Sequence, residues 1–238
     1  MKLLLFLLAP LAVHAQTETR ELVGQIGSRA ALLVLHASRA PDGGWQMAGE
    51  YIVLPTLQRR FLEGESSPEI GVTTLREGAT PILFGRSPSG ELRGTLRGGV
   101  FKGARYAPGG QERERFEFSE EFPPMDAYTA NVRCDADEGT YASSLSMAVD
   151  GGKLQSFDWR SKLAPSSHSC TLANLQQQPL KGGLRFTSGR CHVTLRELGD
   201  YVRIAAENCV EQCGSQAYLE PLLIDRRGNC RLMRPEPR

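Results

Sequence analysis

The chain has 238 residues, and its 28 Lys and Arg nearly balance its 27 Asp and Glu, which leaves a formal net charge of +1. A charge so near zero gives no general attraction to polyanions, and no basic block is interleaved with aromatic residues, so we expect no nucleic-acid binding. No stretch beyond the first residues is apolar over the roughly 20 positions that a transmembrane helix needs. We therefore predict no membrane span in the mature chain.

The first fifteen residues have the pattern of a secretory signal peptide. Lys2 forms a short positive region, an apolar run follows from Leu3 to Leu8, and Val13-His14-Ala15 is a small-residue cleavage site. We expect residues 1–15 to be removed and the mature chain to begin at Gln16. The predicted location is periplasmic or secreted, a compartment in which disulfides persist.

Residues 16–122 contain no cysteine and are predicted to form a β-domain. Apolar residues recur with period two, which is typical of half-buried strands, and Gly, Pro, Asn, Asp and Ser cluster between them as turn signals. This spacing predicts an antiparallel sandwich or a barrel-like meander. The expected strands cover 31–36, 45–53, 61–64, 72–75, 82–84, 91–97 and 115–118.

Two adjacent prolines, Pro123 and Pro124, interrupt strand pairing, so a linker is predicted at 123–126 and a second β-domain at 127–238. In this second part we expect a hairpin from Leu145 to Trp159, with a glycine turn, and strands at 183–187, 191–195 and 201–205. All six cysteines lie here, and their even number predicts structural disulfides worth about 2–4 kcal/mol each. They are Cys134, Cys170, Cys191, Cys209, Cys213 and Cys230.

The stretch from Asn208 to Gly214 predicts the only helical turn. Asn208 is a good N-cap residue, Glu211 completes a capping box, and Gly214 can end the turn in a left-handed conformation. Cys209 and Cys213 would stand on one face of this turn, so we expect each to pair elsewhere, with Cys170, Cys191 and Cys230 as candidates. Cys191 shares the predicted core face of its strand, whereas His192 lies on the opposite face.

Cys213-Gly214-Ser215 resembles the start of the signature of papain-like proteases. The later positions of that signature are absent, and no histidine follows Cys213, so we do not expect a catalytic thiol. A zinc site made by the cysteines and His192 has unusual spacing, and Asp135–Gly139 has only part of a calcium-loop pattern. We predict no catalytic residue, no metal site and no cofactor.

Other polar groups have an ordinary structural interpretation. His36, His168 and His192 cannot be joined to a nucleophile by sequence, and the carboxylates at 112, 114, 120 and 121 fit a solvated face. Arg93 and Arg97 share one face of a predicted strand with Glu91 and Thr95. That face is either a polar exterior or a surface for an anionic ligand.

Four glycine-containing motifs carry a resemblance in the first half: Gly49-Glu50-Tyr51, Phe61-Leu62-Glu63-Gly64, Leu75-Arg76-Glu77-Gly78 and Gly94-Thr95-Leu96. On these motifs the first half resembles β-meander domains of uncharacterised exported bacterial proteins. In size, strand density and use of cysteine, the second half is similar to small disulfide-bonded periplasmic proteins, lysozyme inhibitors among them. The resemblance implies an exported β-protein without a known reaction, and it assigns no functional residue.

We therefore predict a non-enzymatic exported binding or inhibitor module of the bacterial envelope, with an unidentified partner. Residues 161–169 and 87–90 are candidate binding loops. An alternative is an envelope scaffold that binds polysaccharide or lipid, on which Trp45, Tyr51 and Trp159 would stack against sugars if they were exposed. A third hypothesis is a hydrolase, which requires a histidine and a carboxylate in contact within a deep pocket.

Overall fold

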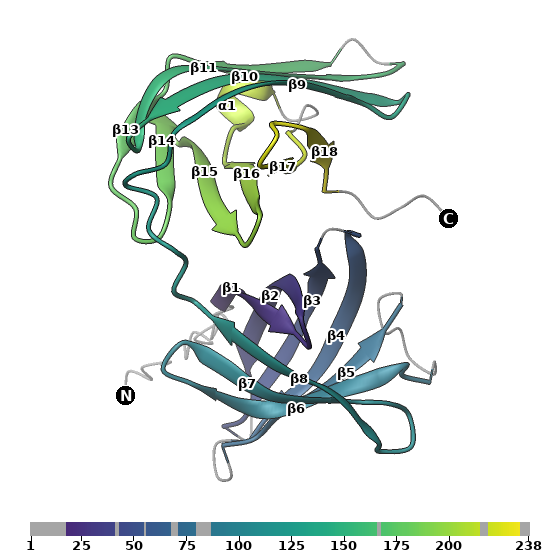
Figure 1. Ribbon diagram of the computed structural model, residues 1–238. Coiled ribbons are helices and arrows are strands. Elements are labelled where there is room, and N and C mark those ends of the chain that lie inside the picture. The colour runs from purple at the N-terminus through teal and green to yellow at the C-terminus, as the bar shows by residue number, and fades with distance from the viewer. Residues whose placement is uncertain are drawn as a thin grey trace, which may run out of the picture.

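The computed structural model describes residues 18–40, 43–54, 56–67, 71–79, 87–165, 168–214 and 219–233, and nearly all regular structure in them is β-strand (Figure 1). This confirms the predicted all-β fold class. The predicted signal peptide and the strand expected at 82–84 lie outside the described residues. Within these ranges, no helix has the length and apolar character needed to cross a membrane.

The first eight strands form a closed antiparallel barrel in which each strand pairs with the next and β1 pairs with β8. Two of them, β1 and β7, were not among the expected strands. The barrel strands are β1 (Glu18–Ile26), β2 (Arg29–Arg39), β3 (Trp45–Val53), β4 (Gln58–Ser66), β5 (Thr73–Gly78), β6 (Gly90–Arg97), β7 (Val100–Tyr106) and β8 (Glu112–Ser119).

Period-two alternation sends one set of side chains into the barrel, and these side chains fill it. The tilted rings of Phe101, Phe116 and Phe118 pack against one another there, with ring centroids 4.6 Å and 5.9 Å apart along the series. Leu33, Leu75 and other aliphatic side chains complete the packing. An eight-stranded barrel is just wide enough for its own side chains to fill, and this barrel has a solid core.

Two glycines allow neighbouring strands of the barrel wall to approach each other closely. Gly94 and Gly103 face each other across β6 and β7, and a Cβ atom on either would clash with the backbone of the other strand. A Cβ atom on Gly94 would also lie 3.0 Å from the ring of Phe116, so its absence leaves room for that ring. Sequence order alone gives no sign of this pairing, although isolated glycines within strands often mark such close approaches.

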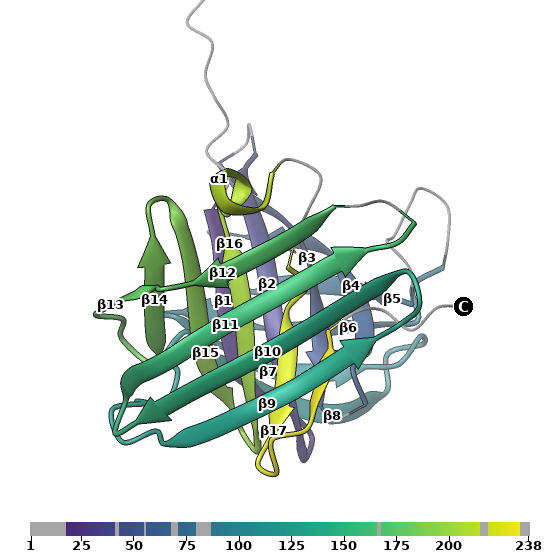
Figure 2. The same ribbon diagram turned by 90° about the horizontal axis from the view of Figure 1, so that it is seen from above.

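The second part of the chain folds into two antiparallel sheets packed face to face (Figure 2). One sheet has the order β12-β11-β10-β9, and the other runs from β13 to β18 in sequence order. The strands are β9 (Ala130–Asp137), β10 (Tyr141–Asp150), β11 (Lys153–Leu163), β12 (Ser169–Ala173), β13 (Gln176–Gln178), β14 (Leu184–Ser188), β15 (Cys191–Leu198), β16 (Tyr201–Glu207), β17 (Leu222–Asp225) and β18 (Cys230–Leu232).

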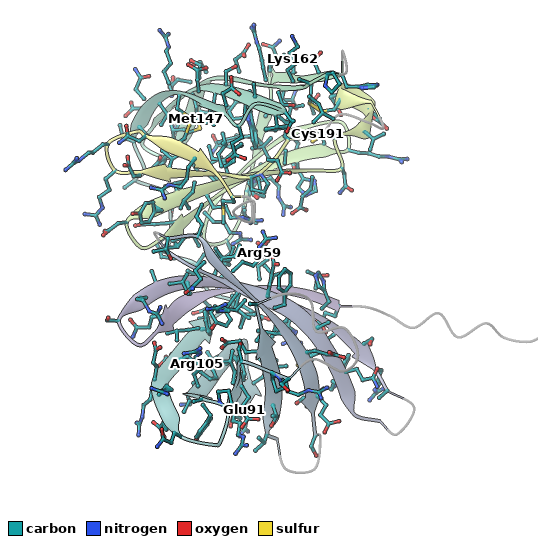
Figure 3. The ribbon with its side chains drawn as sticks, turned by 90° about the vertical axis from the view of Figure 1, so that its right-hand side faces the viewer. Arg59, Glu91, Arg105, Met147, Lys162 and Cys191 are labelled. Carbon is teal, nitrogen blue, oxygen red and sulfur yellow. A yellow bond between two sulfur atoms is a disulfide. The ribbon has the colours of Figure 1, made fainter. Side chains whose placement is uncertain are left out.

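The core between the two sheets is apolar, as the alternation in sequence predicts. Trp159, Phe186, Val193 and Leu195 are fully buried in it, and Cys191 shares their face as expected. Figure 3 shows Cys191 and Met147 within this part of the molecule. His192 lies on the opposite face of β15, also as predicted.

All six cysteines form disulfides, which confirms the predicted staples. Cys134 pairs with Cys230, Cys170 with Cys213, and Cys191 with Cys209. The two cysteines four residues apart therefore reach different strands, as their shared face in a helical turn predicts. Cys209 is joined to β15 in one sheet and Cys213 to β12 in the other.

The predicted helical turn is present as α1 (Val210–Cys213), but the expected capping box is wrong. Cys209 occupies the N-cap position, and the helix has no side-chain cap hydrogen bond. Asn208 instead adopts a left-handed conformation, with φ of 57°, just before the turn. The disulfides at Cys209 and Cys213 fix the turn where a capping side chain would otherwise do so. Gly214 ends it with a positive φ of 75°, but its ψ of 167° lies outside the left-handed region, so the predicted left-handed ending is wrong.

An apolar seam joins the outside of the barrel to the outer face of the β13–β18 sheet. Leu32 and Ile52 of the barrel pack with Leu198 and Leu223 of the sandwich, and Phe122 lies among them. Above the ring of Phe122, at 4.1 Å, lies the guanidinium carbon of Arg196. The segment at the predicted domain boundary is therefore packed between the two halves.

Candidate binding sites

The disulfides decide the chemistry of the cysteine motif. Cys209 and Cys213 are both oxidised, so neither supplies a thiolate nucleophile or a zinc ligand. In the described ranges, no three His, Cys, Asp or Glu side chains are grouped as a metal site would require. The motif that resembles a protease signature is part of a covalent closure.

The predicted histidine candidates lie on surfaces. His36 bonds to Thr19 at 3.0 Å on the barrel exterior, and His168 lies in the exposed β11–β12 connection. His192 Nε2 is 3.0 Å from a carboxylate oxygen of Glu207, whose side chain is 54% exposed. This is a histidine–carboxylate contact, but it lies on the outer face of a sheet.

The predicted carboxylate pairs are divided among separate ion pairs. Glu114 accepts hydrogen bonds from Arg29 at 2.8 Å and 2.9 Å, whereas Glu112 lies near Arg115 at 3.6 Å. The second pair is split in the same way, since Glu120 contacts Arg20 and Glu121 contacts Lys181. Each carboxylate therefore has a cationic partner, and Glu114 also accepts a 3.3 Å hydrogen bond from Arg105.

The aromatic residues considered for sugar stacking are largely inside the protein. Tyr51 is 3% exposed and Trp159 is fully buried, with its indole N–H donating to Ser143 Oγ at 2.9 Å. Trp45 is half-buried, and the guanidinium carbon of Arg39 lies 5.9 Å from its ring centre. Tyr51 and Trp159 are therefore components of the cores rather than of a binding face.

A polar cluster in the barrel interior, the mouth network, is formed by Tyr51, Arg60, Glu77, Ser89 and Arg105. Glu77 is fully buried and accepts hydrogen bonds from Arg105 at 2.7 Å and 2.9 Å and from the Tyr51 hydroxyl at 2.8 Å. The Arg60 guanidinium lies 3.6 Å away. Figure 3 shows Arg105 among the barrel strands.

The mouth network keeps its central carboxylate ionised. Burial by itself raises the pKa of Glu77, but the hydrogen bonds and charge of Arg105, the Tyr51 hydroxyl and the charge of Arg60 outweigh it, and the pKa lies below its usual range. Burial, followed by the charge of Glu77, raises the pKa of Tyr51. Ser89, within a predicted binding loop, donates to the Glu77 carbonyl at 3.1 Å. The network's buried carboxylate is fully paired, Arg105 links the network to Glu114 at 3.3 Å, and the network stabilises this end of the barrel.

A shallow groove of about 580 Å³, the outer-wall groove, runs over β6, β7, β8 and β1. Arg93, Lys102 and Arg115 line it, and the guanidinium carbon of Arg93 lies 5.1 Å from the ring centre of Tyr106. Arg93 also pairs with Glu91. Among the described residues, no ion pair engages Lys102. The arginine face that the sequence marks on β6 thus borders a concave surface.

A second hollow, the inter-sheet cleft, has a volume of about 440 Å³ and lies where the two sheets of the sandwich part at one end. Val132, Val202 and Ile224 line it with buried apolar side chains. Tyr128 and Glu197 line it as well, together with Asp200, Asp225, Arg226 and Arg227, of which Arg226 pairs with Asp200 at 2.7 Å. The cleft therefore combines a hydrophobic lining with a phenol and an excess of one carboxylate over its arginines.

Glu197 is the distinctive group of this cleft. It follows Cys191, Val193 and Leu195 on the inward face of β15, and it is half-buried. No hydrogen bond or ion pair engages its carboxylate within the part of the chain that the structure describes. Burial and the nearby charge of Glu197 both raise the pKa of Tyr128, which places the phenol close to this charge without a hydrogen bond between them.

Sequence reasoning missed Tyr128 and Glu197 as site residues, although one signal was present. The inward alternation of β15 continues from Leu195 to Glu197, and a carboxylate at a core-facing position is unusual. Comparisons of this chain with protein-family models, with curated proteins and with solved structures found no match. Function is therefore argued from the geometry of the two hollows.

Proposed function

We propose that this chain is an exported, non-catalytic binding module of the bacterial envelope that holds a cationic group of its partner in the inter-sheet cleft. The observation that carries the proposal is the half-buried, unpaired carboxylate of Glu197 beside an apolar lining. The partner group best suited to it is a primary ammonium on an aliphatic stem, as in a lysine side chain. Such a group is complementary to the cleft in both charge and polarity.

Charge and shape support this assignment. A carboxylate taken partly out of water loses solvation, and an ammonium that bonds to it restores the lost interactions. The methylene stem would cover Val202 and Ile224, and the Tyr128 ring would add attraction between cation and π system. The volume of about 440 Å³ falls in the range of small-ligand sites, which is roughly 300–1,000 Å³.

Export rests on two independent features. The first fifteen residues have the charge, apolar run and small-residue cleavage pattern of a signal peptide. Three intramolecular disulfides are typical of proteins that mature in an oxidising compartment. A partner in the envelope is consistent with both features.

Calorimetry with two matched probes tests the proposed function. Nα-acetyl-lysine methylamide carries the ammonium, whereas Nα-acetyl-norleucine methylamide has a similar stem without the charge. We expect the oxidised mature chain to bind only the lysine probe, and Glu197→Gln to weaken that binding at least about tenfold, as loss of a charged hydrogen bond does. Glu65→Gln, an exposed carboxylate on the barrel, is the matched control and should change nothing.

Equal binding of both probes would show that the carboxylate has no role in recognition. Unchanged affinity of Glu197→Gln, or no lysine binding at millimolar concentration, would also reject the proposal. Tyr128→Phe keeps the ring but removes the hydroxyl, so it should retain most of the affinity. A loss as large as that of Glu197→Gln would assign recognition to the phenol instead.

The outer-wall groove favours a second candidate function, an envelope scaffold for anionic polysaccharide. Lys102 stands there without an ion-pair partner among the described residues, and Arg93 and Arg115 line the same groove. Retention of the chain on heparin, used as a model anionic polysaccharide, should fall in Lys102→Gln and stay unchanged in Lys153→Gln. Equal retention of the two variants would reject this candidate.

A further inference from the structure

Three arginines meet on the outer face of the sandwich sheet beside the barrel. Arg196 of β15 lies directly opposite Arg203 of β16 in the strand register. Arg185 of β14 lies opposite Thr194, which is two residues before Arg196 and therefore on the same face. We name Arg185, Arg196 and Arg203 the seam arginines.

Their local charge is poorly balanced. Glu21 of the barrel strand β1 lies 3.0 Å from Arg203 and 3.9 Å from Arg196, so one carboxylate serves two guanidinium groups. Like charges directly opposite each other on neighbouring strands are destabilising. The Arg196 and Arg203 side chains are only 18% and 12% exposed, so solvent screens this repulsion incompletely.

Arg185 is the member without a partner. Its Nε is buried and makes no hydrogen bond, and no ion pair engages its guanidinium among the described residues. A buried donor left unsatisfied is costly, and such groups are rare in native proteins. Arg196, by contrast, is fixed by Glu21, by the ring of Phe122 and by a 3.3 Å hydrogen bond to the Gly182 carbonyl.

The electrostatics of Arg196 agree with an excess of positive charge at this place. Burial lowers its pKa most, the charge of Glu21 and more weakly that of Glu207 raise it, and the charges of Arg203 and Arg185 lower it further. The like charges of both neighbours therefore reach Arg196. One more negative group would offset this repulsion.

We propose that the seam arginines bind a phosphate group at the junction of barrel and sandwich, with Arg185 as its main contact. Guanidinium groups present paired N–H donors that match the oxygens of phosphate, and Arg185 has such donors free. Arg196 adds charge from the same face, on which Thr194 lies directly opposite Arg185 in the register. The ligand class is a phosphomonoester or inorganic phosphate.

This proposal does not depend on the inter-sheet cleft. Arg196 and Glu197 are consecutive residues of a strand, so their side chains leave opposite faces of the sheet. Glu197 faces the interior of the sandwich, whereas Arg196 faces the barrel. Loss of one site should therefore leave the other intact.

Titration with inorganic phosphate at constant ionic strength tests the proposal, with thermal unfolding and calorimetry as readouts. We expect phosphate to raise the melting temperature of the full oxidised chain more than chloride does, since a ligand that binds only the folded state stabilises it. Arg185→Gln should weaken phosphate binding at least about tenfold. Without phosphate it should melt at the same temperature as the parent chain or higher, because it removes a like charge.

Arg133→Gln, an exposed arginine on the other sheet, is the matched control, and Glu197→Gln should also bind phosphate normally. Glucose 6-phosphate and vesicles containing phosphatidic acid distinguish a soluble ligand from a lipid headgroup, and binding of either supports the site. The proposal is rejected if phosphate acts no more strongly than chloride. It is equally rejected if Arg185→Gln keeps the parent affinity.

Discussion

The barrel and the sandwich are both antiparallel β-structures, but they close in different ways. In the barrel, β1 pairs with β8, so every strand has two neighbours and no edge is left open. The sandwich has two open sheets, with edges at β9, β12, β13 and β18. Two of its three disulfides lie at these edges, since Cys134–Cys230 joins β9 to β18 and Cys170–Cys213 joins β12 to α1.

The comparison explains why the cysteines occur only in the second half. Hydrogen bonds complete the barrel, and a carboxylate held by two arginines stabilises its mouth. The sandwich lacks such a closing ladder, and covalent links join its separate sheets and the turn that follows β16. Two tryptophans allow each half to be followed, because Trp45 belongs to the barrel and Trp159 to the sandwich.

The largest expected effect comes from reducing the disulfides. We expect the sandwich to lose about 2–4 kcal/mol of stability for each bridge, whereas the barrel should keep most of its own. Denaturant unfolding with and without dithiothreitol measures this in two single-tryptophan variants, Trp45→Phe for the sandwich and Trp159→Phe for the barrel. A barrel transition that shifts as far as the sandwich transition would contradict the comparison.

The next largest effect should be a loss of stability in the barrel rather than in the sandwich. Glu77→Gln leaves Arg105 and Arg60 without their buried counter-charge, and removal of one partner of such a pair costs about 3–5 kcal/mol. Fluorescence of Trp45 in the Trp159→Phe background should report the loss. Glu65→Gln, an exposed carboxylate on β4, should stay within about 0.5 kcal/mol of the parent.

Low pH should also destabilise the barrel through Glu77. The pKa of Glu77 is lowered in the folded state, so its stabilising contribution is present above its unfolded pKa of about 4.3 and is lost as the pH falls through the folded value. Barrel stability should therefore decline more steeply below about pH 4.3 in the parent than in Glu77→Gln. Parallel pH profiles of the two chains would show that Glu77 does not carry this dependence.

The smallest predicted effect is a loss of stability confined to the sandwich, from one hydrogen bond in its core. Ser143→Ala removes the acceptor of the buried Trp159 N–H, which should cost about 1–3 kcal/mol in the sandwich transition alone. Ser144→Ala, one residue away on the outer face of β10, is the matched control and should cost less than about 0.5 kcal/mol. Equal costs for the two variants would indicate that the hydrogen bond contributes nothing.

The local sequence pattern predicted the all-β fold class well, because the alternation of apolar and polar residues can be seen within each strand segment. The sequence around 191–195 predicted both the strand and its buried face, and the spacing of Cys209 and Cys213 predicted separate partners. Short strands such as β13 and β18 carry too few residues to show alternation. They form because they hydrogen-bond to neighbouring strands, β13 to β14 and β18 to β17, and the sequence of the short segment does not contain this information.

The sites depend on distant pairs and were harder to predict. Tyr51 and Glu77 are joined only because β3, β4 and β5 are neighbours in the barrel, and Arg185 meets Arg196 through the register of β14 and β15. Asn208 misled the capping prediction because disulfides at Cys209 and Cys213 override local preference. Only Glu197 was within reach of the sequence, through its position in an otherwise apolar alternation.

The three disulfides are nested in sequence like brackets. The link from Cys191 to Cys209 lies inside the loop closed by Cys170 and Cys213, which lies inside the loop closed by Cys134 and Cys230. Each inner link shortens the free chain that the next link must close, and the entropy of loop closure falls with that length. Oxidation can therefore proceed from the innermost ring outward, with every correct bond making the following one easier to form.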